Sequence, residues 1–245
     1  MQLYQTKNYE EMSKKAAGII SAQVILKPDS VLGLATGSTP LGIYENLIDG
    51  YKNGDIDFTQ VKTVNLDEYK GLGSENKQSY RHFMNSNLFD HVNINKENTN
   101  VPNGLEENIE FECDRYDNVL NDLAGVDLQL LGIGNNGHIG FNEPADSFTK
   151  GTHYEALAQS TIDANSRLFE ECEVMPTSAY TMGIKTIMDA KTVLLVANGK
   201  GKAKAIKEAL TGPITPKVPA SILQMHKNLI VVADEEALSE LNNNK

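Results

Sequence analysis

The sequence predicts an α/β fold: a single domain with a mostly parallel, Rossmann-like doubly wound sheet flanked by helices. Two patterns predict it. Short apolar runs, each followed by a polar loop, recur along the 245 residues, and such runs are typical of buried parallel strands. Patterns of helical spacing fill the intervals, and strands that alternate with helices build right-handed βαβ units. No internal repeat is visible, and one α/β domain of this length, residues 1–245, is common.

The N-terminal elements are the most clearly marked. A helix is expected over residues 8–26, where Asn8 suits the N-cap position, apolar residues recur near helical spacing and Pro28 ends the helix. The apolar run Val31–Leu34 follows as a short strand. Pro40 then suits the first turn of a helix that ends near residue 50.

The same order of strand and polar loop recurs through the rest of the chain. Further strands are expected at 61–66, 126–133, 192–197 and 229–233. Helices are expected around 78–90, 106–124, 176–188 and 203–210, and after Asp234. Ligands bind at the carboxyl ends of strands in such sheets, near the point where the strand order reverses. We therefore expect the polar loops after the strands to form one site.

The charge balance and the cysteine content exclude several classes of function. Lys and Arg number 22 and Asp and Glu 33, a formal net charge of −11, whereas a nucleic-acid binder needs a basic face. Charges in the N-terminal segment argue against a signal peptide, and the lack of an apolar run of about 18 residues argues against a membrane span. Cys113 and Cys172 fit neither a disulfide framework nor a zinc-site spacing. A cytoplasmic protein that binds neither nucleic acid nor membrane is expected.

The first candidate site is the turn Thr-Gly-Ser-Thr-Pro at residues 36–40. Backbone N–H groups and hydroxyls at a helix N-terminus suit an anion such as phosphate. The turn is neither a Walker A loop nor a dinucleotide-binding turn. An ordinary tight turn with helix-capping Thr and Ser side chains fits the same pattern.

The second candidate is the carboxylate pair Asp67 and Glu68 after the next strand. A carboxylate at a strand end can act as a general base, and partial burial beside a like charge would raise its pKa toward the working pH. The alternative is a solvated acidic loop.

The third candidate, GIGNNGHIGFNEP at residues 132–144, is the most informative stretch. Its four glycines, within nine residues, let the backbone bend closely round a ligand. His138 can exchange a proton near neutral pH, and Glu143 could orient it, although a structural histidine in a glycine-rich turn is the alternative. A metal site built from Asp67, His138 and Glu143 lacks a ligand cluster such as H-E-x-x-H, so no metal is expected.

Two basic residues complete the candidate set. Arg167 lies in the segment Asn165-Ser166-Arg167, and Lys202 follows the strand expected at 192–197. In an acidic chain, basic groups near strand ends fit a phosphate clamp. Solvated surface charges are the alternative for each.

Taken together, these motifs resemble the glucosamine/galactosamine-6-phosphate isomerase family, and within it the glucosamine-6-phosphate deaminases. The matching segments are LGLATGSTP at 32–40, NLDEY at 65–69, GIGNNGHIGFNEP at 132–144, ANSR at 164–167 and GKGKA at 199–203. The resemblance implies conversion of glucosamine 6-phosphate to fructose 6-phosphate and ammonia, an enzyme of the hydrolase class, with no cofactor. It assigns ring opening to His138 with Glu143 and C2 proton abstraction to Asp67. The 6-phosphate would be held by Gly37, Ser38, Thr39, Arg167 and Lys202.

The sequence departs from the family pattern at two places. Asn136 stands where many members have Asp, so it can fix the histidine tautomer by a hydrogen bond but supplies no charge to an imidazolium. His153 and Glu155 stand where longer, hexameric relatives have basic residues that bind an allosteric activator. Weak or absent allostery is therefore expected, with monomer and homo-oligomer both left open.

Two other functions share this type of fold. In 6-phosphogluconolactonases the corresponding histidine motif usually runs into Leu-Phe-Pro instead of the Phe141-Asn142-Glu143-Pro144 found here. A non-catalytic sugar-phosphate sensor domain would not need the carboxylate–histidine set. The deaminase reading is therefore preferred.

Overall fold

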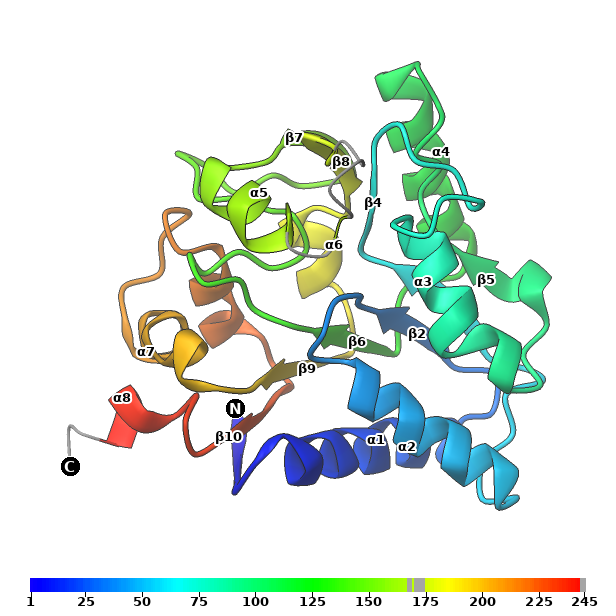
Figure 1. Ribbon diagram of the computed structural model, residues 1–245, viewed down its shortest axis with the longest axis horizontal. Coiled ribbons are helices and arrows are strands. Elements are labelled where there is room, and N and C mark those ends of the chain that lie inside the picture. The colour runs from blue at the N-terminus through cyan, green and yellow to red at the C-terminus, as the bar shows by residue number, and fades with distance from the viewer. Residues whose placement is uncertain (167–168, 170–174, 243–245) are drawn as a thin grey trace.

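The structure is a computed structural model and describes residues 1–166, 169 and 175–242 (Figure 1). Its main sheet has the strand order β1-β10-β9-β6-β2-β3-β5, and neighbouring strands run parallel. These strands are β1 (Gln2–Thr6), β2 (Val31–Leu34), β3 (Lys62–Asn65), β5 (Thr99–Asn100), β6 (Leu128–Leu131), β9 (Thr192–Ala197) and β10 (Leu229–Asp234). The predicted parallel α/β sheet is confirmed.

Helices flank this sheet, as predicted. They are α1 (Tyr9–Leu26), α2 (Leu41–Lys52), α3 (Tyr80–Asn87), α4 (Ile109–Asp122), α5 (Gln159–Ser166), α6 (Ile184–Met188), α7 (Ala203–Thr211) and α8 (Ser239–Asn242). Short 3₁₀ segments lie at Phe89–His91, Lys96–Asn98, Lys200–Lys202 and Pro219–Met225. In Figure 1, α1 and α2 lie side by side along one face, and α4 and α6 lie on the other. No helix in the described part of the chain is long and apolar enough to cross a membrane.

Local signals positioned the first helix correctly. The Asn8 side chain accepts a hydrogen bond from the backbone N–H of Glu11 at 2.9 Å, so Asn8 is the N-cap of α1. The strands of the sheet interior, such as β2 and β6, are buried at every residue. Burial on both faces explains why they are mostly apolar, with Gln129 as the polar exception in β6, instead of alternating with polar residues.

A second, antiparallel sheet was not predicted. It has the order β4-β8-β7, formed by β4 (Asp67–Tyr69), β8 (Ser178–Thr181) and β7 (His153–Ala156). The expectation of a loop at Asp67–Tyr69 was therefore wrong, and so was that of a helix through 176–188, where only α6 is helical. The secondary structure of these segments depends on pairing between strands that are distant in sequence, and β8 is buried at every position. Asp67 consequently starts a buried strand.

Candidate active site

A cavity of about 660 Å³ opens at the carboxyl ends of β2, β3, β6 and β9. Its lining comes from the loops that follow these strands, as the fold predicts for a parallel sheet. The predicted site residues that line it are Gly37, Ser38, Thr39, Asp67, Asn136, His138 and Lys202. Glu143 lies behind His138, and Arg167 lies outside the described residues. The loops after these four strands are thus brought together with two helices, α3 through Tyr80 and α5 through Thr161 and Asn165.

The loop after β2 is built to present backbone N–H groups. Gly37 has a φ of +99°, which favours glycine, and Pro40 is the N-cap of α2. The Thr39 hydroxyl donates a 2.8 Å hydrogen bond to the Asn198 side-chain oxygen in the loop after β9. That second loop also carries Lys202. The small-residue turn and the cationic side chain of Lys202 therefore line the same cavity.

Asp67 lines the cavity and is 6% exposed. Burial, and to a lesser extent the neighbouring charge of Glu68, raise the pKa of the Asp67 carboxyl to about 8. Aromatic rings form the adjacent wall, where Tyr80 stacks on Phe141 with ring centroids 5.9 Å apart. A carboxylate with so high a pKa is a stronger base than an exposed one.

Glu68 points the other way and has a structural task. Its carboxylate accepts hydrogen bonds from the backbone N–H groups of Tyr69, Tyr80 and Arg81 at 2.9 to 3.0 Å and from the Ser79 hydroxyl at 2.8 Å. Burial raises the pKa of the Glu68 carboxyl in spite of these bonds. The carboxylate thus ties β4 to the first turn of α3, and the reading of this pair as a solvated acidic loop does not hold.

We expect Glu68→Ala to lower the free energy of unfolding by about 2–4 kcal/mol, because it leaves buried N–H donors without an acceptor. Urea denaturation measures the loss, and Glu75→Ala on an exposed turn is the control. Glu68→Gln, which removes the like charge, should shift the pKa of Asp67 downward. A stability of Glu68→Ala equal to that of the control would contradict this account of the cap.

His138, Asn136 and Glu143 form one contact group. The Asn136 amide donates to Glu143 Oε2 at 2.7 Å, and the same amide group accepts from the His138 backbone N–H at 3.1 Å. His138 Nδ1 lies 3.5 Å from Glu143 Oε2, a distance that permits an electrostatic contact. Asn136 therefore holds the carboxylate directly behind the imidazole.

The carboxylate of this group is ionised. Burial raises the pKa of Glu143, but the neighbouring His138 and the Asn136 amide outweigh burial and lower the pKa to about 2. The His138 side chain is 18% exposed and that of Glu143 5%, so the imidazole stands between a buried anion and the cavity. This arrangement lets the ring exchange protons with a ligand while the carboxylate fixes its orientation.

Gly134 makes room for the imidazole. A Cβ atom at Gly134 would lie within 2.4 Å of the His138 ring atoms Cε1, Nδ1 and Nε2. We expect Gly134→Ala to displace the ring and lower kcat by about 10- to 100-fold, since a misplacement of about 1 Å is worth that much. Gly132→Ala, where a Cβ meets nothing within 4 Å, is the matched control. Equal kcat values for the two variants, measured with thermal unfolding, would refute the steric argument.

Some of the lining was not predicted from the sequence. Tyr80 enters from α3, Thr161 and Asn165 from α5, and Asn198 from the loop after β9. The Asn165 amide donates to the Tyr69 hydroxyl at 3.0 Å, which ties α5 to the aromatic wall. Of these, Asn198 carried a usable signal because it directly follows a predicted strand, and Asn165 did because it belongs to the family motif at 164–167.

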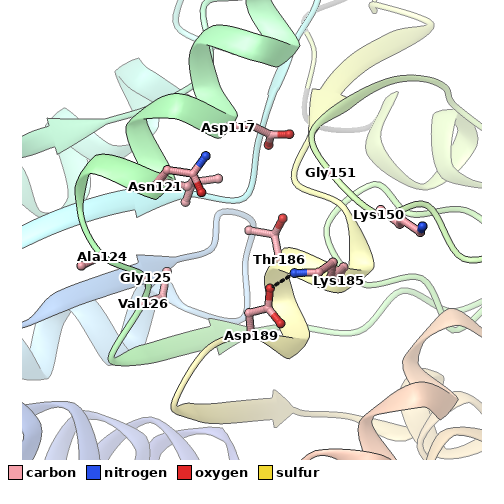
Figure 2. Close-up of a pocket in the computed structure, with 11 residues that line it drawn as sticks. Asp117, Asn121, Ala124, Gly125, Val126, Lys150, Gly151, Lys185, Thr186 and Asp189 are labelled. Carbon is pink, nitrogen blue, oxygen red and sulfur yellow. Dashed lines mark hydrogen bonds and ion pairs between the residues drawn. The ribbon is translucent and has the colours of Figure 1, made fainter.

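A second hollow of about 490 Å³ lies between α4 and α6 (Figure 2). Lys185 and Asp189 pair with each other there, and Asp117 accepts two hydrogen bonds from Thr152, at 2.9 and 2.6 Å. None of the described site residues predicted from the sequence lines it. Within residues 1–166, 169 and 175–242, no group of His, Cys, Asp and Glu could hold a metal ion.

A buried carboxylate with a raised pKa and a small-residue turn line one cavity with His138, whose ring is backed by Glu143, a combination suited to an enzyme that moves protons on a small molecule. The family follows from comparison with known sequences. The chain belongs to the family described as glucosamine-6-phosphate isomerases/6-phosphogluconolactonase, whose model matches residues 6–232.

Relatives within this family are similar over nearly their whole length. A glucosamine-6-phosphate deaminase of Lachnoclostridium phytofermentans is 60% identical over 232 residues, covering 95% of this chain and 98% of the relative. One of Clostridium botulinum is 54% identical over 242 residues, covering 99% of each. The resemblance identified from the motifs is confirmed at the level of the family.

Solved structures of similar fold include a member of the same family. The structure of a monomeric glucosamine-6-phosphate deaminase superposes with a TM-score of 0.95 at 44% identity, covering 98% of this chain and 100% of that one. A 6-phosphogluconolactonase from Thermotoga maritima superposes with a TM-score of 0.76 at 18% identity, covering 96% and 99%. The second likeness shows a shared fold only.

Proposed function

We propose that this protein converts glucosamine 6-phosphate and water to fructose 6-phosphate and ammonia. The observation that carries the proposal is the placement of Asp67 and His138 in one cavity that also holds the small-residue turn and Lys202. The names of the relatives at 54% and 60% identity support the same substrate.

Ring opening comes first and falls to His138. The imidazole moves a proton between the ring oxygen O5 and the O1 hydroxyl, which frees the C1 aldehyde. Glu143, ionised at neutral pH because its pKa is about 2, orients the ring and balances a positive charge on it. Asn136 keeps this carboxylate in place through its 2.7 Å hydrogen bond.

Asp67 then removes the proton from C2, and the C1 carbonyl accepts the electron pair. Return of a proton to C1 converts the enol-amine to a C2 imine, and one water molecule hydrolyses the imine to the ketone and ammonia. Each proton transfer by a placed group contributes roughly 10²- to 10⁴-fold. The consumed water makes the enzyme a hydrolase, and the carbonyl of the substrate replaces any cofactor as electron acceptor.

The 6-phosphate is assigned to the turn at Gly37, Ser38 and Thr39 and to Lys202, all of which line the cavity. Arg167 is proposed as a further phosphate ligand. Because the chain carries a net charge of −11, attraction from a distance is not available, and short-range N–H and cationic contacts must hold the anion.

A substrate comparison tests the function. Glucosamine 6-phosphate should give ammonia and fructose 6-phosphate, whereas 6-phosphogluconolactone should be hydrolysed no faster than in buffer. Lactone hydrolysis without nitrogen release would replace the proposal by the lactonase alternative. Binding of glucosamine 6-phosphate without turnover would favour the sensor domain.

We propose that residues 1–245 form one domain, that the protein acts in the cytoplasm and that it works without nucleic acid or membrane. A monomer is proposed because the similar solved deaminase is monomeric. Sedimentation of the purified protein tests the oligomeric state.

A further inference from the structure

Asp234 lies outside the cavity, at the end of β10, yet it contacts a loop of the site. It is 5% exposed. Both of its carboxylate oxygens lie 3.0 Å from the backbone N–H of Gly199, and Oδ1 also accepts from Ala237 N–H at 2.8 Å. A buried carboxylate that accepts such bonds fixes the backbone that donates them.

Gly199 is the bend of the loop that carries Lys202. Its φ of +81° places the chain in the left-handed region, and the 3₁₀ segment Lys200–Lys202 begins directly after it. Asn198, on the other side of Gly199, accepts the 2.8 Å bond from Thr39. Through one N–H group, Asp234 therefore fixes both the cation of the site and a partner of the small-residue turn.

Tyr9 braces the other loop from α1. Its hydroxyl accepts from the Gly42 backbone N–H at 2.8 Å and donates to the Ser38 carbonyl at 3.1 Å. Because the Ser38 carbonyl and the Thr39 N–H belong to one planar peptide group, this bond fixes the orientation of that N–H in the turn. Neither Tyr9 nor Asp234 lines the cavity itself.

We propose that Asp234 and Tyr9 are positioning residues for the phosphate subsite, an inference that rests on the proposed function. Each acts through a backbone group and touches no reacting atom. Replacing Asp234 or Tyr9 should lower the affinity for phosphate and leave the proton transfers at Asp67 and His138 intact.

The test measures kcat and KM for glucosamine 6-phosphate, and the Kd of inorganic phosphate by calorimetry. Asp234→Ala and Tyr9→Phe should each raise KM and the phosphate Kd by a common factor of about 3–10, the worth of one lost hydrogen bond. The kcat should stay within about twofold. Asp234→Asn keeps one side-chain oxygen that can accept from the Gly199 and Ala237 N–H groups, so it should give a smaller rise of the same kind. This variant replaces Asp234→Ala in the test if Asp234→Ala does not fold.

Asp127→Asn is the matched control. Asp127 is 4% exposed and accepts from the Val31 backbone N–H at 2.8 Å, at the amino end of β2. Its replacement should lower the melting temperature with KM and the phosphate Kd unchanged.

Folded Asp234 and Tyr9 variants with an unchanged phosphate Kd would overturn the inference, and so would an equal rise in Asp127→Asn. If the wild-type protein releases no ammonia but binds phosphate, the proposed function fails. The phosphate Kd still decides the positioning roles in that case.

Discussion

Replacing Asp67 by asparagine is expected to lower kcat by about 10²- to 10⁴-fold, the contribution of a positioned general base. Asparagine has nearly the same shape but cannot accept the C2 proton. Because Asp67 is not assigned to the phosphate, the Kd of inorganic phosphate should stay within about twofold of the wild-type value. Steady-state kinetics and calorimetry on the same preparation measure the two quantities.

The raised pKa of Asp67 also predicts how activity and stability depend on pH. With a pKa of about 8 in the folded protein, the base is ionised only at higher pH, so kcat/KM should rise as the pH increases through about 8. In the unfolded chain the carboxyl ionises near pH 4. Between about pH 4 and 8 the folded state binds the extra proton, so the free energy of unfolding falls as pH rises. Asp67→Asn should remove this part of the pH dependence.

Asp189→Asn is the control for both measurements, since Asp189 lies in the hollow away from the cavity. It should leave the kinetics and the pH dependence of unfolding as they are in the wild-type protein. An Asp67→Asn variant with more than about a tenth of wild-type kcat would contradict the assignment of the base.

Replacing His138 by alanine should lower kcat by about 10²- to 10³-fold. The loss is limited because some sugar opens its ring in solution without the enzyme, whereas no such route replaces the base at C2. Added imidazole should restore part of the activity by filling the space left by the ring. A rate curve against imidazole concentration at fixed substrate measures the rescue.

Glu143→Gln provides the matched comparison, because it keeps the shape behind His138 and removes the charge. We expect a loss of about 10-fold, and imidazole should not reverse it. If His138→Ala and Glu143→Gln both left kcat unchanged, ring opening would not depend on this group of residues.

The sequence predicted five of the seven strands of the parallel sheet, all but β1 and β5, because these five carry their signal locally. A strand buried on both faces, such as β2 or β6, reads as a short apolar run between breakers, whatever it pairs with. β4 and β8 carry no such signal. Ser178–Thr181 becomes a strand because two other segments pair with it. Asp67–Tyr69 lies more than a hundred residues before it in the sequence, and His153–Ala156 about 25 residues before it. Pairing of this kind is tertiary information.

In the site, too, local signals could be predicted from the sequence, whereas contacts set by the tertiary fold could not. Asp67, His138 and Lys202 were found because each follows a predicted strand, and strand ends meet at one edge. Their partners were not predictable in this way. The Asn136–Glu143 bond depends on how a glycine-rich loop folds back, and the contact of Asp234 with Gly199 joins residues 35 positions apart. The cap that Glu68 forms on α3 depends on the same kind of contact.

The most direct test of the central claim is the amount of ammonia and fructose 6-phosphate formed from glucosamine 6-phosphate by the wild-type protein and by Asp67→Asn. We expect the two products in a 1:1 ratio from the wild-type protein, and both formed at least about 100-fold more slowly by a folded Asp67→Asn variant that still binds phosphate. No ammonia from the folded wild-type protein, or undiminished ammonia from Asp67→Asn, would contradict the central claim.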